Sequence, residues 1–148
     1  MNRVLTLYFD NCCNSRLFDD DAQPETKAEI DAIRRIINNR RRGRYIIVGS
    51  FAGDAEINKI PGDTARLAAK QKYDEYIGKW VKKTAPIMAR ARKLMASGLD
   101  SWDAAHLAAA EAAGADYLLT VDKDFLKVCS RSKITKVNVI NPIDFERW

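Results

Sequence analysis

Short apolar runs alternate with longer helical patterns along this chain, and this alternation limits the possible fold more than any other feature of the sequence. Four apolar runs predict strands at residues 4–9, 45–48, 117–121 and 137–140. Strands that are separated by helical segments pair in parallel, because each helix returns the chain to the start of the next strand. The pattern therefore predicts an α/β fold with a central parallel β-sheet of four to five strands flanked by helices.

The intervals between these runs have helical spacing. In the first interval, isoleucines repeat every three to four residues between Pro24, which suits a first helical position, and Gly43. Further helices are expected at residues 52–58, 64–81, 86–96 and 101–113, with Pro and Gly residues between them. No internal repeat or low-complexity linker divides the sequence. We therefore expect residues 1–148 to form one domain, a length that is sufficient for a single core.

The number of cysteines and the lengths of the apolar runs indicate where in the cell the protein is located. The chain has three cysteines, an odd number, and they form neither a disulfide framework nor a CxxC metal pair. The apolar run at the N-terminus is too short for a signal peptide, and no other run reaches the roughly 18 apolar residues of a spanning helix. We expect a soluble protein of the reducing cytoplasm, without membrane contact.

Four carboxylates fall where a parallel sheet would bring them together. Asp10 and Asp122 directly follow predicted strands, and the carboxyl ends of parallel strands form the usual site edge of such a sheet. Asp103 lies in the first turn of the apolar helix at 101–113, near the same edge if the crossover is right-handed. Glu56, on the short helix after the second strand, is the fourth candidate, with Asp54 as the alternative at this position.

A cluster of carboxylates needs a positive partner, because like charges at close range cannot all stay ionised. Hard oxygen ligands favour Mg²⁺ or Mn²⁺. His106 is the only histidine, which excludes sites built from several histidines. We interpret His106, one helical turn from Asp103, as a side chain that fills space or bonds locally.

Several motifs resemble those of PIN-domain proteins, a family of metal-dependent ribonucleases that includes VapC-like toxins. They are the strand that ends in Asp10, followed by a D-x-C-C-x-x-R-x-F-D-D opening; Ser50 followed by Glu56; DSWDAAHLAAA; and LLTVDKDF. In this order and at these separations, they span nearly the whole chain. One departure concerns the Asp-x-Asn opening that is common in the family. Here Asn11 stands one place early and Cys12 occupies the position of the Asn.

The resemblance implies roles for particular residues. Asp10, Glu56, Asp103 and Asp122 would be catalytic metal ligands, Asp124 an auxiliary metal ligand, and Asn11 and Ser50 supporting residues. The implied reaction is in-line attack of water on an RNA phosphodiester, which needs no histidine. The family also implies a cognate antitoxin partner and, frequently, a homodimer.

Basic residues offer weaker signals for RNA binding. The net charge is +5, and part of it lies in the run Arg40, Arg41, Arg42 and Arg44. These residues and Arg16 are candidate contacts to the RNA backbone, which would be salt-sensitive and carry little sequence information.

Other functions need different evidence. A cysteine hydrolase that uses Cys12 or Cys13 with His106 would resist chelators and be inactivated by thiol reagents. An aspartyl-phosphate enzyme would have a second Asp where Cys12 stands. The main alternative is a non-catalytic PIN-like module that binds RNA or a protein, and a cleavage assay with and without metal separates it from an enzyme.

Overall fold

A single parallel sheet forms the centre of the computed structural model, which describes residues 3–146. Its strands lie in the order β3-β2-β1-β4-β5, and every neighbouring pair is parallel. The predicted α/β class with four to five parallel strands is confirmed. The strands are β1 (Leu5–Phe9), β2 (Tyr45–Ser50), β3 (Lys79–Val81), β4 (Tyr117–Leu119) and β5 (Asn138–Ile140).

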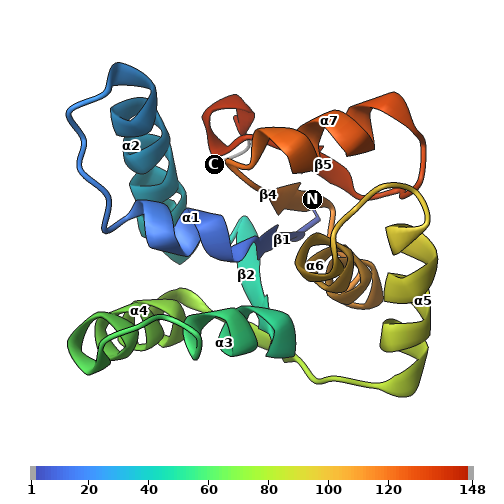
Figure 1. Cartoon of the computed structure of the whole chain (residues 1–148). Coiled ribbons are helices and arrows are strands. Elements are labelled where there is room, and N and C mark those ends of the chain that lie inside the picture. Colours follow the sequence, from blue (N-terminus) through green and yellow to red (C-terminus); the bar gives the residue numbers. More distant parts are fainter. Residues whose placement is uncertain (1–2, 147–148) are drawn as a thin grey trace.

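Seven α-helices surround the sheet in the described residues, as Figure 1 shows. Two short 3₁₀ helices, η1 (Arg40–Arg42) and η2 (Pro142–Asp144), complete the architecture. None of the helices in residues 3–146 has the length and the apolar composition that a membrane span requires. The α-helices are α1 (Asn11–Arg16), α2 (Pro24–Asn39), α3 (Phe51–Ile57), α4 (Asp63–Tyr76), α5 (Ala85–Met95), α6 (Ser101–Ala112) and α7 (Lys123–Arg131).

Two apolar clusters hold the helices on the two faces of the sheet. Successive side chains of a strand point to opposite faces, so Leu7 and Phe9 of β1 join one cluster and Tyr8 joins the other. The first cluster includes apolar residues of α2 and α4, and the second includes residues of α5, α6 and α7. The fold is therefore a three-layer sandwich with β1 at its centre.

Helix α6 is an unusual element because every residue from Asp103 to Ala110 is buried. Alanine is the smallest residue with high helix propensity, so a run of alanines allows close packing against neighbours on several sides. The helix packs against α5, α3 and β2. The cap of its N-terminus is Asp100, whose side chain accepts a hydrogen bond from the Asp103 N–H over 2.8 Å. Asp103 and His106 are thus held on a rigid, buried helix.

Some predicted elements were wrong in extent. The helix predicted at 64–81 ends at Tyr76, and residues 79–81 form the edge strand β3 instead. The helix predicted to continue up to Gly43 ends at Asn39 and is followed by η1. The last predicted strand residues, 120 and 121, lie beyond β4. Helices α1 and α7 were not predicted.

Candidate metal centre

A pocket of about 380 Å³ opens at the carboxyl edge of the sheet. Residues from the ends of β1 and β4, from α1 and α3, and from the start of α6 contribute to it. Most of the charged side chains in its wall are acidic. The wall is formed by Asp10, Asn11, Cys12, Ser15, Arg16, Asp19, Glu56, Asp100, Trp102, Asp103, Val121 and Asp122.

Asp10 is the most deeply placed carboxylate of this pocket, with 4% of its surface exposed. It follows β1 directly, and its backbone N–H donates to the carbonyl of Leu119 at the end of β4. Its Oδ2 accepts hydrogen bonds from the Thr120 hydroxyl at 2.8 Å and from the Cys12 thiol at 3.2 Å. These donors stabilise the buried carboxylate and leave Oδ1 directed toward His106.

Glu56 reaches the same place from α3. The N-terminus of this helix is capped by Ser50, whose hydroxyl oxygen accepts from the N–H groups of Ala52 and Gly53. The Glu56 carboxylate is hydrogen-bonded to Nε2 of His106. Asp54, two residues earlier, instead forms a salt bridge with Lys70 of α4. The structure therefore brings Glu56, and not Asp54, to the pocket.

His106 lies between the two carboxylates. Its Nε2 is bonded to Glu56 and lies 3.4 Å from Oδ1 of Asp10, while its Nδ1 is 2.7 Å from the Tyr8 hydroxyl. Complete burial favours the neutral imidazole, but the negative charges of Asp10 and Glu56 outweigh burial and raise the pKa of His106. The Tyr8 hydroxyl in turn bonds the hydroxyl of Ser50, so a chain of polar groups runs from the pocket into the core.

Asp103 lies one helical turn before His106 and is also buried. Burial, together with the nearby charges of Asp10, Asp100 and Asp122, raises the pKa of its carboxyl group to about 8. Such a shift is typical of a carboxyl group crowded by like charges. The cluster thus favours the binding of a proton or a cation near neutral pH.

The acids after β4 occupy two different positions. Asp122 is half-buried in the pocket wall, and its Oδ1 also caps α7 by accepting from the N–H groups of Asp124 and Phe125. Asp122 therefore both caps a helix and lies in the pocket wall. Asp124 is exposed, and it is not among the residues that line the pocket.

The two residues predicted to support the site also differ in position. Asn11 lines the pocket and is 8% exposed, and its side-chain oxygen is buried without a hydrogen-bond donor among the described residues. An unsatisfied buried acceptor is costly, and a cation or its hydration shell would satisfy it. Ser50 does not line the pocket. It is fully buried, and its hydroxyl is hydrogen-bonded to the Tyr8 hydroxyl, which is in turn hydrogen-bonded to His106.

The candidate RNA-binding arginines separate into two locations. Arg16 lines the pocket, where it donates to Asp19 at 3.0 Å and lies 3.3 Å from the buried Glu29. Arg40, Arg41 and Arg42 form η1, and Arg44 follows just before the first residue of β2, at the end of the sheet opposite to the pocket. The structure does not bring this run to the acidic cluster.

One set of side chains has the spacing of a metal site. Ligand atoms of Asp10, Glu56 and His106 all lie within 4.8 Å of one another. A ligand set that adds an imidazole nitrogen to carboxylate oxygens is more suitable for a transition metal such as Mn²⁺ than a set of oxygens alone would be. With the unpaired oxygen of Asn11 close to Asp10 in sequence and in the same pocket, the residues fit a divalent cation.

His106, Tyr8 and Thr120 were not predicted as site residues. One signal was present in the sequence, because His106 is three residues after Asp103 and therefore on the same side of the helix. No sequence signal marked Tyr8 or Thr120, which read as ordinary members of apolar strands.

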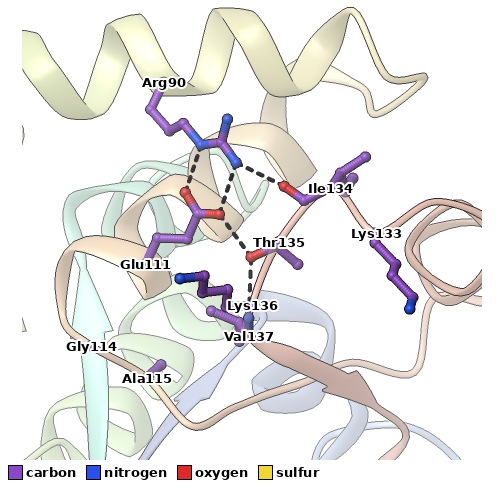
Figure 2. A pocket seen from close by; sticks show the side chains of 9 residues that line it. All are labelled: Arg90, Glu111, Gly114, Ala115, Lys133, Ile134, Thr135, Lys136 and Val137. Atoms are coloured by element: carbon purple, nitrogen blue, oxygen red, sulfur yellow. Dashed lines mark hydrogen bonds and ion pairs between the residues drawn. The ribbon is translucent and has the colours of Figure 1, made fainter.

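A larger cavity, of about 690 Å³, lies at the opposite edge of the sheet, before β4 and β5. Figure 2 shows that its main polar groups bind one another: Arg90 donates to both oxygens of Glu111 and to the carbonyl of Ile134, and the Thr135 hydroxyl donates to Glu111. This network joins α5 and α6 to the segment before β5. Although this cavity is larger, Glu111 is the one carboxylate among the described residues that line it, so it has no acidic cluster that could hold a cation.

The three-layer fold and the carboxylate cluster at the carboxyl edge of its sheet define an α/β protein with a candidate cation site. The chain belongs to the PIN-domain family, whose model matches residues 8–130. Among curated proteins, no relative is detected by sequence.

Solved structures with the same fold include three VapC or VapBC proteins. VapC20 of Mycobacterium tuberculosis, a sarcin-ricin loop cleaving toxin, has a TM-score of 0.59 at 15% identity, over 89% of this chain and 98% of that one. VapBC2 of Rickettsia felis, bound to a promoter DNA fragment, has a TM-score of 0.60 at 12% identity. VapBC-1 of nontypeable Haemophilus influenzae has a TM-score of 0.60 at 15% identity. Both of these matches cover 93% of this chain and 98% of theirs.

Proposed function

We propose that this protein is a metal-dependent endoribonuclease that hydrolyses RNA phosphodiester bonds at the acidic pocket. The observation that carries the proposal is the convergence of Asp10, Glu56 and His106 within 4.8 Å, beside Asp103 and Asp122, in a PIN domain. PIN-domain proteins are usually nucleases, and the structurally similar VapC20 is a toxin that cleaves the sarcin-ricin loop.

The proposed cofactor is Mg²⁺ or Mn²⁺, held by Asp10, Glu56 and His106 and supported by the carboxylates of Asp103 and Asp122. When bound, such an ion lowers the pKa of a coordinated water and neutralises charge on the phosphate. The exposed Asp124 keeps the auxiliary role that the family resemblance implies.

The protein's own groups fix the site in several ways. The Thr120 hydroxyl and the Cys12 thiol orient the Asp10 carboxylate, and Tyr8 fixes the ring of His106 through Nδ1. Among residues 3–146, Arg16 is the only cationic side chain in the pocket wall. It is held in place by Asp19 and Glu29, so it is suited to bind a phosphate of the substrate.

A cleavage assay tests this proposal directly. The protein is incubated with labelled RNA in Mg²⁺, in Mn²⁺ and in chelator, and we expect cleavage only in the presence of metal. RNA binding without cleavage in either metal would favour the non-catalytic module. Cleavage that resists the chelator and is lost with a thiol reagent would favour the cysteine hydrolase.

We further propose that the protein is the toxin of a type II toxin-antitoxin pair. Two of the similar structures are VapBC proteins, and one of these is bound to promoter DNA. The neighbouring open reading frame tests this idea. A gene for a small DNA-binding protein whose product co-purifies with this chain and inhibits cleavage would support it, and a nuclease without such a neighbour would be a housekeeping enzyme. A homodimer, as in many PIN proteins, is part of the same proposal.

A further inference from the structure

Trp102 is the aromatic side chain in the wall of the acidic pocket. It is the second residue of α6, directly before Asp103, and its half-buried side chain forms part of the pocket wall. The exposed Lys59 lies over its ring, with Nζ 5.9 Å from the ring centroid. The part of this indole that remains accessible lies beside carboxylates in the pocket wall, where a bound ligand can cover it.

Trp80 provides a contrast within the same chain. Its ring packs edge-on against Tyr73, with centroids 6.0 Å apart, and Lys70 lies 5.4 Å from its centroid. Tyr73 is itself buried, so Trp80 lies over the core, although 39% of its own surface is exposed. Trp102 has no aromatic neighbour of this kind among residues 3–146, and the pocket is the surface that it faces.

The negative charge of the pocket means that an RNA ligand would gain from contacts that do not depend on charge, such as contact with an aromatic ring. Six carboxylates line the wall against one cationic side chain in the described residues, Arg16, so the wall carries a net negative charge even where Arg16 meets a phosphate. A polyanion gains little electrostatic attraction from such a wall. Stacking of a base on an aromatic ring does not depend on the charge of the backbone, and it contributes substantially to the binding of single strands. The six carboxylates are Asp10, Asp19, Glu56, Asp100, Asp103 and Asp122.

We propose that Trp102, with Lys59 beside it, forms a nucleobase-binding subsite in which one base of the RNA stacks on the indole ring. This inference rests on the proposed function, because the substrate is taken to be RNA. Lys59 then contacts a phosphate or the rim of the stacked base. Since Asp103 is the next residue along the helix, the stacked nucleotide lies beside the bond that is cleaved. A base can stack in this way only when it is out of a helix, so the nucleotide at the subsite is unpaired.

Fluorescence reports on the subsite directly. The sequence contains three tryptophans, so a Trp80→Phe, Trp148→Phe variant leaves Trp102 as the only one. This variant is titrated in chelator, which prevents turnover, with a single-stranded RNA of mixed sequence about ten nucleotides long. We expect the RNA to quench the emission, and the same RNA in a perfect duplex to leave it unchanged.

Affinity and kinetics supply the second measurement. Trp102→Ala is expected to weaken binding of the labelled single strand about 5- to 150-fold, and Trp102→Phe, which keeps a ring, by less. Trp80→Phe is the matched control and should bind as the wild type does. In the cleavage assay, Trp102→Ala should raise KM with little change in kcat, because stacking stabilises the bound substrate and the transition state alike.

The outcomes separate this inference from the proposed function. If the wild type cleaves RNA, but Trp102→Ala binds RNA as tightly as the wild type does and RNA does not quench Trp102, the subsite is overturned and the nuclease stands. Absence of cleavage, combined with weaker RNA binding by Trp102→Ala, would support the subsite and overturn the nuclease. A wild-type protein that neither binds nor cleaves RNA would overturn both. Melting temperatures of all variants confirm that each is folded.

Discussion

Nε2 of His106 lies 3.4 Å from Oδ1 of Asp10, although 96 positions separate the two residues in the sequence. The same nitrogen is bonded to Glu56, so one imidazole connects a residue that follows β1 with a residue of α3. The ring is completely buried and is fixed from behind by Tyr8. The carboxylates therefore share a partner that the protein itself supplies, and this arrangement leads to four predictions.

Asp10→Asn should abolish metal binding and cleavage with little effect on the fold. The amide has nearly the same shape but cannot supply a negative oxygen to the cation, so we expect activity to fall by at least about 100-fold. In the wild type, Mn²⁺ at about 100 times its Kd should add about 2.7 kcal/mol to the free energy of unfolding, which melting curves detect. Asp31→Asn, on the exposed side of α2, is the control. Full cleavage by Asp10→Asn would contradict the assignment.

Glu56→Gln and Asp54→Asn form a matched pair on the same helix. Because Glu56 reaches the pocket and Asp54 is paired with Lys70, only Glu56→Gln should remove the increase in melting temperature that Mn²⁺ produces. Asp54→Asn should cost at most about 1 kcal/mol of stability, since its salt bridge is partly exposed. If the melting temperature of Asp54→Asn also failed to rise with Mn²⁺, the assignment of Glu56 rather than Asp54 as the metal ligand on α3 would be contradicted.

His106→Gln should change the preference between metals. An imidazole ligand favours Mn²⁺ over Mg²⁺, so we expect the ratio of their affinities to fall by about 10-fold or more in this variant. Titration calorimetry with each metal measures the ratio. Tyr8→Phe removes only the hydroxyl that fixes Nδ1 and should produce a smaller change. A ratio that is the same in wild type and His106→Gln would show that the ring is not a ligand.

Asp103→Asn should stabilise the metal-free protein near pH 8. The pKa of Asp103 is raised from 3.8 to about 8 on folding, so between these values the folded state binds a proton that the unfolded state releases. The contribution of this group to the free energy of unfolding therefore falls as the pH rises from about 4 to about 8. Asparagine is neutral at every pH and avoids this loss.

Melting curves in chelator at several pH values measure the effect. We expect Asp103→Asn to be more stable than the wild type by on the order of 1 kcal/mol at pH 8, with the difference shrinking as the pH approaches 4. Saturating Mn²⁺ should reverse the order, because the wild type binds the ion more tightly. A variant that is less stable than the wild type at pH 8 in chelator would contradict the crowding of the carboxylates.

The sequence predicts the general architecture well because strand and helix periodicities differ and the chain keeps to them. It predicts the ends of elements less well. The aromatic and apolar residues Tyr73, Tyr76, Ile77 and Trp80 continue a helical spacing, but the edge of β2 offers backbone partners to residues 79–81. This pairing depends on a strand about 30 positions earlier in the chain, and no local pattern reveals it.

The same distinction applies to the pocket. Asp10, Asp103 and Asp122 are recognisable because each stands at the end of a strand or the start of a helix, positions that the topology brings to one edge. His106 sits in the middle of an alanine-rich helix, where its periodicity is that of a core residue. Its importance comes from the distance to Asp10 and Glu56, which only the three-dimensional fold establishes.

The central position of β1 has a consequence for the order in which the chain is synthesised. Asp10 is made early, but its hydrogen-bonding partners Leu119 and Thr120 and the neighbouring Asp122 are made more than 100 residues later. A nascent chain that still lacks β4 cannot close the pocket around Asp10, whatever else has folded. The ribosome therefore completes most of this protein before the pocket can close, and products truncated before β4 lack one wall of it.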